Sequence, residues 1–312
     1  MKKHVRIILS AALLASIPLT TASADLFGTL NKIGTAVEKA QEVKQKVDQA
    51  QEVLLTIDRA AEPITQQDSY FIGRTVASNV LTDYKLYNDA KAVAYLNKIC
   101  KAITMNSDTP KIYKDYCVSI IDSDEINALS TSGGHIFITT GVLKCCSSED
   151  EVAAIIAHEI AHIHLEHAVV AIKTARTTDA IAKSATMAKD YTKQYGNLNQ
   201  DEKNSVDFLT KANIAAMNLI TETGYTKGQE FDADKKAISL MTDAGYDPNA
   251  LVDVLTMIKE KSGDSKEGWS KTHPKPDERI KKAKTILAKF TFAGASREVR
   301  QARFERALAG IR

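Results

Sequence analysis

The chain has 312 residues, 44% of them hydrophobic, and its 41 basic and 39 acidic side chains leave a formal charge of +2. This length and composition exclude intrinsic disorder and fit one large domain with appendages or two small domains. The near balance of charge excludes a global field of the kind that gathers nucleic acid or coats an anionic membrane. No nucleic-acid partner is therefore expected.

Residues 1–24 have the three parts of a signal peptide. A basic start at 2–6 is followed by an apolar run at 7–19 and a small-residue cleavage site at 22–24. The alternative, a retained membrane anchor, needs about 20 apolar residues. No later stretch is long and apolar enough to cross a membrane, so we expect an exported chain that is not an integral membrane protein.

Four cysteines follow, and they are Cys100, Cys117, Cys145 and Cys146. In an oxidising compartment an even number of cysteines predicts disulfide bonds, or else plain burial. A thiolate metal site is the alternative, but the CxxC spacing of zinc ribbons is missing, and adjacent cysteines cannot easily present two tetrahedral ligands. The pairing stays open, because four cysteines allow three connectivities.

The segment 25–62 predicts a long amphipathic helix. Between Ala36 and Ile57, apolar residues recur at alternating spacings of four and three, with Glu, Lys and Gln between them. Such a helix packs on the protein's own body or in a hairpin, or it forms a coiled coil with a partner. Both alternatives remain open.

Residues 63–290 are predicted to form the main domain. A helical region is expected over 70–103, followed by strand-like runs at 116–121, 126–130 and 135–140. The second and third runs read as paired strands joined by a turn. The predicted fold class is therefore α+β and mostly helical, with a small sheet beside the helix that comes next.

That helix begins with a capping box at Ser148, because Glu151 lies three residues further on, and an apolar series makes it a buried helix. The rest of the chain reads as helical. The predicted segments are a long stretch at 168–222, a helix at 228–244 and a last pair of helices ending in a helical tail at 291–312.

The capped helix carries the pattern HExxH at residues 158–162. A spacing of four puts His158 and His162 on one face, where two neutral imidazoles can bind one zinc ion. Glu159 projects about 100° around the helix from His158, so it can take a proton from a metal-bound water and pass it to the leaving amine. Chance coincidence on a core helix is the alternative, but burying these three polar side chains without a partner costs free energy. We predict one zinc ion per chain and Glu159 as the catalytic base.

A catalytic zinc needs a third protein ligand. Metzincins take it from a histidine six residues after the second one, where this chain has Ala168. His164 and His167 are off register and read as surface or packing residues. Glu230 offers a carboxylate on the later helix, and Asp234, one turn on, can accept the free ring N–H of a ligand histidine. Two acids at this spacing are common on solvated faces, but here apolar residues surround them.

With these motifs in this order, the chain resembles the HtpX-like zinc metalloendopeptidases of metallopeptidase family 48. The resemblance covers about residues 70–288. It rests on the strand region 127–141, the acidic lead at 148–151 into HExxH, the motif at 230–234, and Thr272-His273-Pro274 with Arg279.

The resemblance implies a gluzincin fold and the cleavage of unfolded or misassembled envelope proteins. It also implies a place in the periplasm of a Gram-negative bacterium, in solution or peripheral to a membrane, with outer-membrane assembly machinery as a partner. Membrane-embedded relatives carry transmembrane helices, and some exported ones carry a helical-repeat domain. This chain resembles the soluble exported branch without that domain.

The resemblance further implies that an edge strand aligns an extended peptide over the zinc. Asn127 and Ala128, together with Gly134 and Ile136, would supply backbone pairing. The alternative is that Asn127 and the glycines only form a turn. His273 either stabilises the oxyanion or occupies the open zinc position as a latch, unless it is a loop residue without a role.

Two other functions remain open besides the peptidase. One is a non-proteolytic envelope assembly or client-binding factor with a structural or latched zinc. The other is a coiled-coil adaptor that uses the helix at 36–57.

Overall fold

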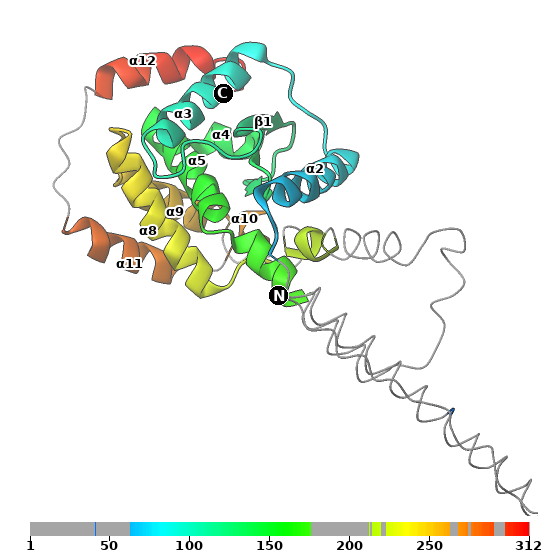
Figure 1. The fold of residues 1–312 in the computed structure, drawn as a ribbon. Helices are drawn as coiled ribbons and strands as arrows, with labels where there is room; N and C mark the ends of the chain where they lie inside the picture. The colour runs from blue at the N-terminus through cyan, green and yellow to red at the C-terminus, as the bar shows by residue number, and fades with distance from the viewer. Residues whose placement is uncertain are drawn as a thin grey trace, which may run out of the picture. The chain divides into compact units, whose positions relative to one another are not determined.

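The computed structural model describes residues 63–175, 212, 214–219, 223–262, 268–273, 276–289 and 297–311, together with residue 41. The chain divides into two compact units, Met1–Leu54 and Leu55–Arg312. The predicted signal peptide at 1–24 and the predicted helix at 25–62 lie outside the described residues, apart from Gln41, which is helical. Every labelled element of Figure 1 belongs to the second unit.

The second unit is mostly helical with one small sheet, which confirms the predicted fold class (Figure 1). Its first elements are α2 (Gln66–Asp83), α3 (Ala90–Met105), β1 (Cys117–Ile121), β2 (Ala128–Ser130), β3 (His135–Thr139), α4 (Thr140–Cys145) and α5 (Glu149–His164). Its later elements are α8 (Lys227–Asp243), α9 (Ala250–Ser262), α10 (Trp269–Thr272), α11 (Pro276–Leu287) and α12 (Arg297–Ala307).

The sheet has the strand order β1-β3-β2, so β3 is the central strand. β1 pairs with β3 in parallel, and β2 pairs with β3 antiparallel. The three predicted strands and the pairing of the last two are thus confirmed, with slightly shorter bounds.

Both faces of the sheet are covered by helices. Ile136 and Ile138 of β3 point into the main core with α3 and α5, while Phe137 between them packs against Ala77 and Val80 of α2. A strand that is buried on both faces reads as an uninterrupted apolar run, which is what β3 shows in the sequence.

The helical region predicted over 70–103 was wrong in one respect, because it is two helices rather than one. α2 ends at Asp83, and α3 begins after Asp89, whose carboxylate accepts the backbone N–H groups of residues 91 and 92. Between them the chain joins the sheet edge, where the Tyr87 N–H donates to the Ile120 carbonyl at 2.8 Å. The N-cap at Asp89 was the sequence feature that marks this break.

α5 is buried almost from end to end, as predicted. Its N-cap is Ser148, whose hydroxyl accepts the Glu151 N–H at 3.2 Å. The predicted capping box is only half formed, because the Glu151 carboxylate accepts the N–H of Ser147 instead of the N–H of Ser148. α8 and α9 both pack against α5, and α8 runs alongside it in Figure 1.

The predicted tail at 291–312 contains α12, which packs on α5 and α3. Phe304 and Leu308 are both fully buried in the main core. The Arg303 side chain pairs with the buried carboxylate of Glu149 at the start of α5, which also accepts the Tyr95 hydroxyl at 3.0 Å. α12 is therefore part of the core.

None of the four cysteines, all of which lie in the described residues, forms a disulfide bond, so the structure has none of the disulfides that their even number suggested. Cys100 and Cys146 are buried, and Cys117 is exposed. Burial, reinforced by nearby Cys117, raises the pKa of the Cys100 thiol to about 12.

Among the described residues, no single helix has the length and apolar composition to cross a membrane. One bent pair, α5 with the helix His167–Ala175, meets that criterion jointly, and its two helices are bent by 41°.

Candidate metal centre

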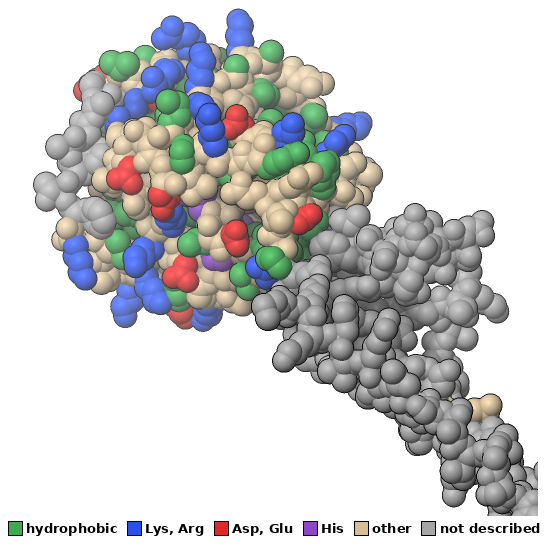
Figure 2. All heavy atoms as spheres, in the orientation of Figure 1, with side chains coloured by type: hydrophobic (Ala, Val, Ile, Leu, Met, Phe, Trp, Pro, Cys, Tyr) green, Lys and Arg blue, Asp and Glu red, His purple; other side chains and the backbone are tan. Residues whose placement is uncertain are grey.

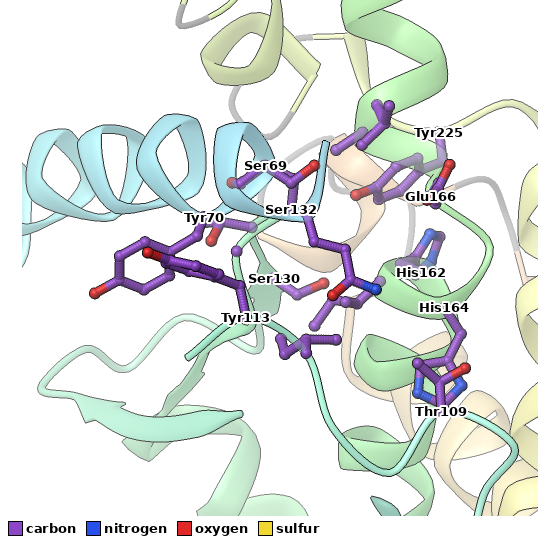
Figure 3. Close-up of a pocket in the computed structure, with 17 residues that line it drawn as sticks. Ser69, Tyr70, Thr109, Tyr113, Ser130, Ser132, His162, His164, Glu166 and Tyr225 are labelled. Carbon is purple, nitrogen blue, oxygen red and sulfur yellow. The ribbon is translucent and has the colours of Figure 1, made fainter. Parts of the chain in front are cut away.

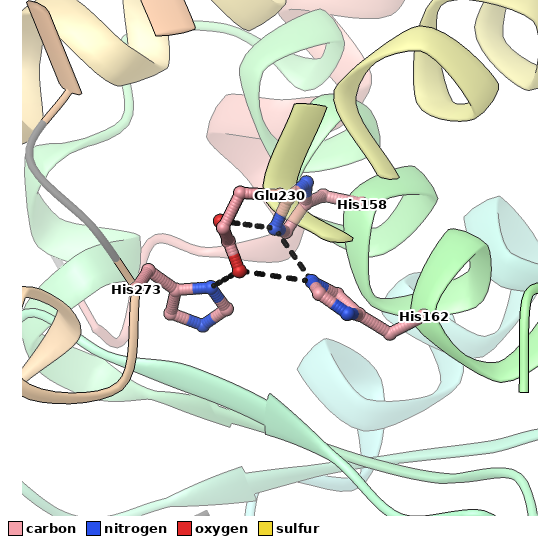
Figure 4. Close-up of side chains that lie close together, drawn as sticks. All are labelled: His158, His162, Glu230 and His273. Carbon is pink, nitrogen blue, oxygen red and sulfur yellow. Dashed lines mark hydrogen bonds and ion pairs between the residues drawn. The ribbon is translucent and has the colours of Figure 1, made fainter. Parts of the chain in front are cut away.

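Three segments that lie far apart in the sequence bring their polar side chains together beneath the surface. α5 supplies His158, Glu159 and His162, and α8 supplies Glu230. His273 is the C-cap residue directly after α10. Figure 4 shows the three histidines and Glu230. Each of these side chains is at most 3% exposed. On the face of the molecule shown in Figure 2, only small areas of histidine are visible.

Four of these side chains point one ligand atom each toward a common point. Atoms of His158, His162, Glu230 and His273 all lie within 4.8 Å of one another. The two Nε2 atoms of His158 and His162 are 3.0 Å apart, and the Glu230 carboxylate lies 3.5 and 3.4 Å from them. Imidazole and carboxylate donors at this spacing form the ligand set that suits zinc.

The protonation of two ligands already suits a cation. Burial lowers the pKa of His162 well below its usual range, so the ring is neutral and has a lone pair to offer. Burial raises the pKa of Glu230, but His273 and Arg279 outweigh this effect and hold it well below its usual range, so the group is a carboxylate. Metal binding requires these forms.

His158 is held from behind by the residue predicted for that purpose. Its Nδ1 lies 3.1 Å from the Asp234 carboxylate. Burial and Arg279 lower the pKa of His158, but the hydrogen bonds with Asp234 and Glu230 outweigh them and raise it to about 9. A metal ion at Nε2 therefore has to displace a proton from this ring at neutral pH.

Arg279 of α11 joins the two carboxylates of α8. Its Nε and Nη2 donate to Asp234 at 2.8 and 2.6 Å, and its Nη1 lies 2.7 Å from the other α8 carboxylate, Glu230. The guanidinium is 1% exposed, so it neutralises two buried negative charges at once. In the sequence, Arg279 stands out only as part of a motif, and no spacing rule links it to this site.

His167, which the sequence indicated to be a surface or packing residue, is buried and packs against a candidate ligand. Its Nδ1 lies 2.9 Å from the Nδ1 of His162, and it is 6% exposed. On one straight helix the two would lie far apart, but α5 ends at His164 and Glu166 adopts a φ of 52°, which turns the chain. Tyr225 stacks on the other side of the His162 ring, with the centroids 3.8 Å apart.

His164 has a different partner, in agreement with a packing role. Its Nε2 lies 2.8 Å from the Tyr116 hydroxyl, away from the group of ligands. The two histidines that follow HExxH therefore differ in place, and only the second one touches the candidate centre.

Glu159 has no hydrogen-bond partner among the described residues, although it is completely buried. The Nε2 of His273 lies 4.0 Å from a Glu159 oxygen. A buried carboxylate without a partner costs several kcal/mol, on the order of the penalty for an unpaired charge. A metal ion beside it, with a water to bond the carboxylate, would remove this cost, so the residues fit a metal site.

The backbone positions predicted to pair with a peptide need correction. Because β3 is central, Ile136 is paired with Val118 on one side and with Ser130 on the other. Gly134 has a φ of 89° in the turn before β3, and its N–H donates to the Thr131 carbonyl at 3.1 Å. Neither residue can accept an added strand.

β2 lies at one edge of the sheet, and no other described strand pairs with its outer side. Asn127 and Thr131 turn their backbone toward β3, since the Asn127 carbonyl accepts the Thr139 N–H and the Thr131 N–H donates to the His135 carbonyl. In an antiparallel pair, the alternate residues Ala128 and Ser130 therefore point their backbone groups outward. Of the four predicted positions, Ala128 directs its backbone away from β3, although the residue is only 1% exposed, and Asn127 offers a buried side-chain oxygen without a hydrogen-bond partner among the described residues.

Comparison with known proteins places these features in a family context. A model of peptidase family M48 matches residues 90–287. The mitochondrial metalloendopeptidase OMA1 of Schizosaccharomyces pombe is 26% identical over 195 residues, which are 62% of this chain and 52% of that protein.

Two bacterial relatives give a similar match. The putative beta-barrel assembly-enhancing protease of Vibrio cholerae is 24% identical over 206 residues, 62% of this chain and 38% of its own. The beta-barrel assembly-enhancing protease of Escherichia coli is 24% identical over 210 residues, 64% of this chain and 39% of its own. The chain spans about half or less of the length of these curated relatives.

Proposed function

Because the chain belongs to peptidase family M48, we propose that it is a zinc-dependent endopeptidase with Glu159 as the general base. The observation that carries this proposal is the buried carboxylate of Glu159, which has no hydrogen-bond partner in the described part of the chain and lies beside four converging ligand atoms. A buried acid in this position is suited to bond a reacting water, whereas a purely structural site would not need one.

His158, His162 and Glu230 would hold one zinc ion per chain. The bound ion would polarise the scissile carbonyl and acidify a water molecule beside it. Asp234 fixes the ring of His158 through Nδ1, and Arg279 fixes the carboxylates of Asp234 and Glu230. The ligands are thus oriented by partners that do not themselves touch the ion.

Glu159 performs the proton transfers. It accepts a proton from the attacking water and returns it to the amine that leaves when the peptide bond breaks. The open edge of β2 lies next to α5, where the Ser130 hydroxyl donates to the Glu159 carbonyl at 3.2 Å. An extended peptide that pairs with Ala128 and Ser130 would therefore run past the reacting groups.

His273 is poised to act as a latch. Its Nδ1 lies 2.8 Å from Glu230, and it belongs to the group of four ligand atoms. Four protein ligands make a closed structural zinc site, whereas catalysis needs an open position. The His273 ring would then have to move aside before a substrate carbonyl can bind. Pro274, the next residue in the sequence, lies outside the described residues.

For substrates, we propose unfolded or misassembled proteins of the cell envelope. Backbone pairing at an edge strand carries little sequence information, which suits unfolded chains. Two relatives are named as proteases that enhance beta-barrel assembly, and residues 1–24 have the pattern of an export signal. These facts support a periplasmic enzyme that works with outer-membrane assembly machinery.

The test compares the purified chain with its Glu159→Gln variant in the presence of Zn²⁺, with casein and an unfolded outer-membrane protein as substrates. Cleavage by the first and its loss in the second, with unchanged zinc content, supports the proposal. Glu260→Gln, the same change at an exposed residue of α9, is the control and should cleave normally. Equal cleavage by both would rule out Glu159 as the base. No cleavage by either, with tight client binding, would favour a non-proteolytic assembly factor.

A further inference from the structure

A pocket of about 200 Å³ lies directly beside the candidate metal centre (Figure 3). His162 and Tyr225 line one end of it, and Tyr70 and Tyr113 line the other end. Ser130, at the end of β2, lies between them. The pocket therefore touches both a zinc ligand and the open strand edge of the proposed peptidase.

The mouth of the pocket carries an aromatic cluster. The ring of Tyr70 lies 5.4 Å from that of Phe71 and 5.5 Å from that of Tyr113. Phe71 and Tyr113 are 45% and 41% exposed. Exposed aromatic groups at a cavity mark a binding surface, because they bury a large area with little loss of side-chain entropy.

The interior is lined by both apolar and polar side chains, two histidines among them, and carries little charge. Ile112, Ile163 and Val169 line it, together with several serine and threonine hydroxyls. Among the described residues that line it there is no lysine or arginine, and the one acid is Glu166, which is exposed. A charged guest would find no ion-pair partner deep inside, whereas an aromatic ring would be in contact with apolar surface.

The size of the pocket indicates a single side chain. Pockets that enclose whole small ligands have volumes of about 300–1,000 Å³, and this one is smaller. An extended peptide along β2 points successive side chains to opposite sides. A side chain that enters a pocket between Ser130 and His162 belongs to a residue next to the bond that Glu159 would cleave.

We propose that this pocket is a specificity site that binds an aromatic side chain flanking the cleaved bond. The inference rests on the proposed peptidase function and deepens it. Aromatic residues are buried in folded proteins and exposed in unfolded ones. The pocket would thus let the enzyme choose unfolded segments although backbone pairing at β2 is insensitive to sequence.

The test uses two quenched fluorescent peptides that differ only in having Phe or Ala beside the cleaved bond. The full chain should cleave the Phe peptide with a kcat/KM about tenfold higher or more. Tyr113→Ala should remove most of this preference by lowering kcat/KM for the Phe peptide alone. Leu81→Ala, at a residue of α2 that is 38% exposed and does not line the pocket, should keep the preference.

A structural effect of Tyr113→Ala would lower cleavage of both peptides equally, and that result would overturn the proposal. Equal kcat/KM for the two peptides in the unaltered chain would overturn it as well, while leaving the peptidase function standing.

Binding of the two peptides to Glu159→Gln is measured by fluorescence anisotropy. It tests the specificity pocket separately from the peptidase function. If the unaltered chain cleaves neither peptide but Glu159→Gln binds the Phe peptide more tightly, the peptidase function fails and the pocket stands. Equal binding of both peptides overturns the pocket.

Discussion

The two helix-borne histidines are each fixed by a partner on the far side of the ring. Asp234 lies behind the Nδ1 of His158, and His167 lies behind the Nδ1 of His162. Such contacts set which ring nitrogen is free to bind a metal and keep the ring in place before the ion arrives. The Asp234 carboxylate and the His167 imidazole thus both hold the ring of a candidate ligand in place.

The neighbouring histidines allow a matched test of this role. His167→Ala should weaken zinc binding by about tenfold, since loss of such a partner costs 10–100-fold in affinity. His164→Ala should leave zinc affinity nearly unchanged, because His164 bonds Tyr116 instead. Competition with a fluorescent zinc chelator measures both constants. The positioning role of His167 is refuted if the two variants bind zinc equally well.

Removal of His273, the proposed latch, should raise the peptidase activity. We expect His273→Ala to bind zinc more weakly and yet to hydrolyse peptide severalfold faster, because an open position becomes available. Zinc affinity and kcat on a fluorogenic peptide are the two measurements. A fall of kcat by about 10²–10³ would show instead that His273 stabilises the oxyanion.

At the scale of elements, α5 is held at its N-terminal end by charged contacts. Glu149 and Asp150, in its first turn, lie where a helix N-terminus favours negative charge. Both are buried, and α12 brings Arg303 and Arg300 to pair with them. The C-terminal helix thus compensates the buried acids at the start of the helix that bears the HExxH motif.

This arrangement predicts that α12 matters for stability. Phe304→Ala should lower the free energy of unfolding by about 3–5 kcal/mol, the usual cost of deleting a buried phenyl group. Val299→Ala on the same helix should change it by less than about 0.5 kcal/mol, because Val299 is 66% exposed. Urea unfolding followed by circular dichroism compares them. A small effect of Phe304→Ala would mean that α12 is a loosely attached tail.

At the scale of the whole molecule, the candidate centre joins segments from α5, α8, α10 and α11. Two buried carboxylates and a buried guanidinium already meet there, and Glu159 adds a third carboxylate, which no described residue hydrogen-bonds. Such a cluster is costly in the absence of a cation, because each charge has lost its hydration. The ion would therefore contribute to the stability of the whole domain as well as to its chemistry.

Zinc removal should accordingly lower the melting temperature. A ligand present at 1,000 times its Kd stabilises the native state by about 4.1 kcal/mol. For a domain of this size, that amounts to roughly 8–16 °C. Differential scanning calorimetry with zinc and with chelator gives the shift. Glu159→Gln should retain the shift, and His158→Ala should lose most of it. An unchanged melting temperature in the unaltered chain would show that zinc does not bind the native state.

Several features could be predicted from the sequence because neighbouring residues decide them. The spacing within HExxH places His158, Glu159 and His162 on one helix, and Ser148 marks where that helix begins. Strand-like runs of residues also located the three strands. The metal roles of His158, His162 and Glu230 stay predictions, although the structure brings their ligand atoms together.

Only the tertiary structure decided how these segments meet. Strand order cannot be inferred from a strand's own residues, and the central place of β3 is what removed Gly134 and Ile136 as peptide partners. The turn at Glu166 brought His167 back to His162, and the packing of α11 placed Arg279 between two acids. Local sequence determines which groups a helix or strand carries. Their partners are set by the packing of distant elements, because buried charges need one another wherever they lie in the chain.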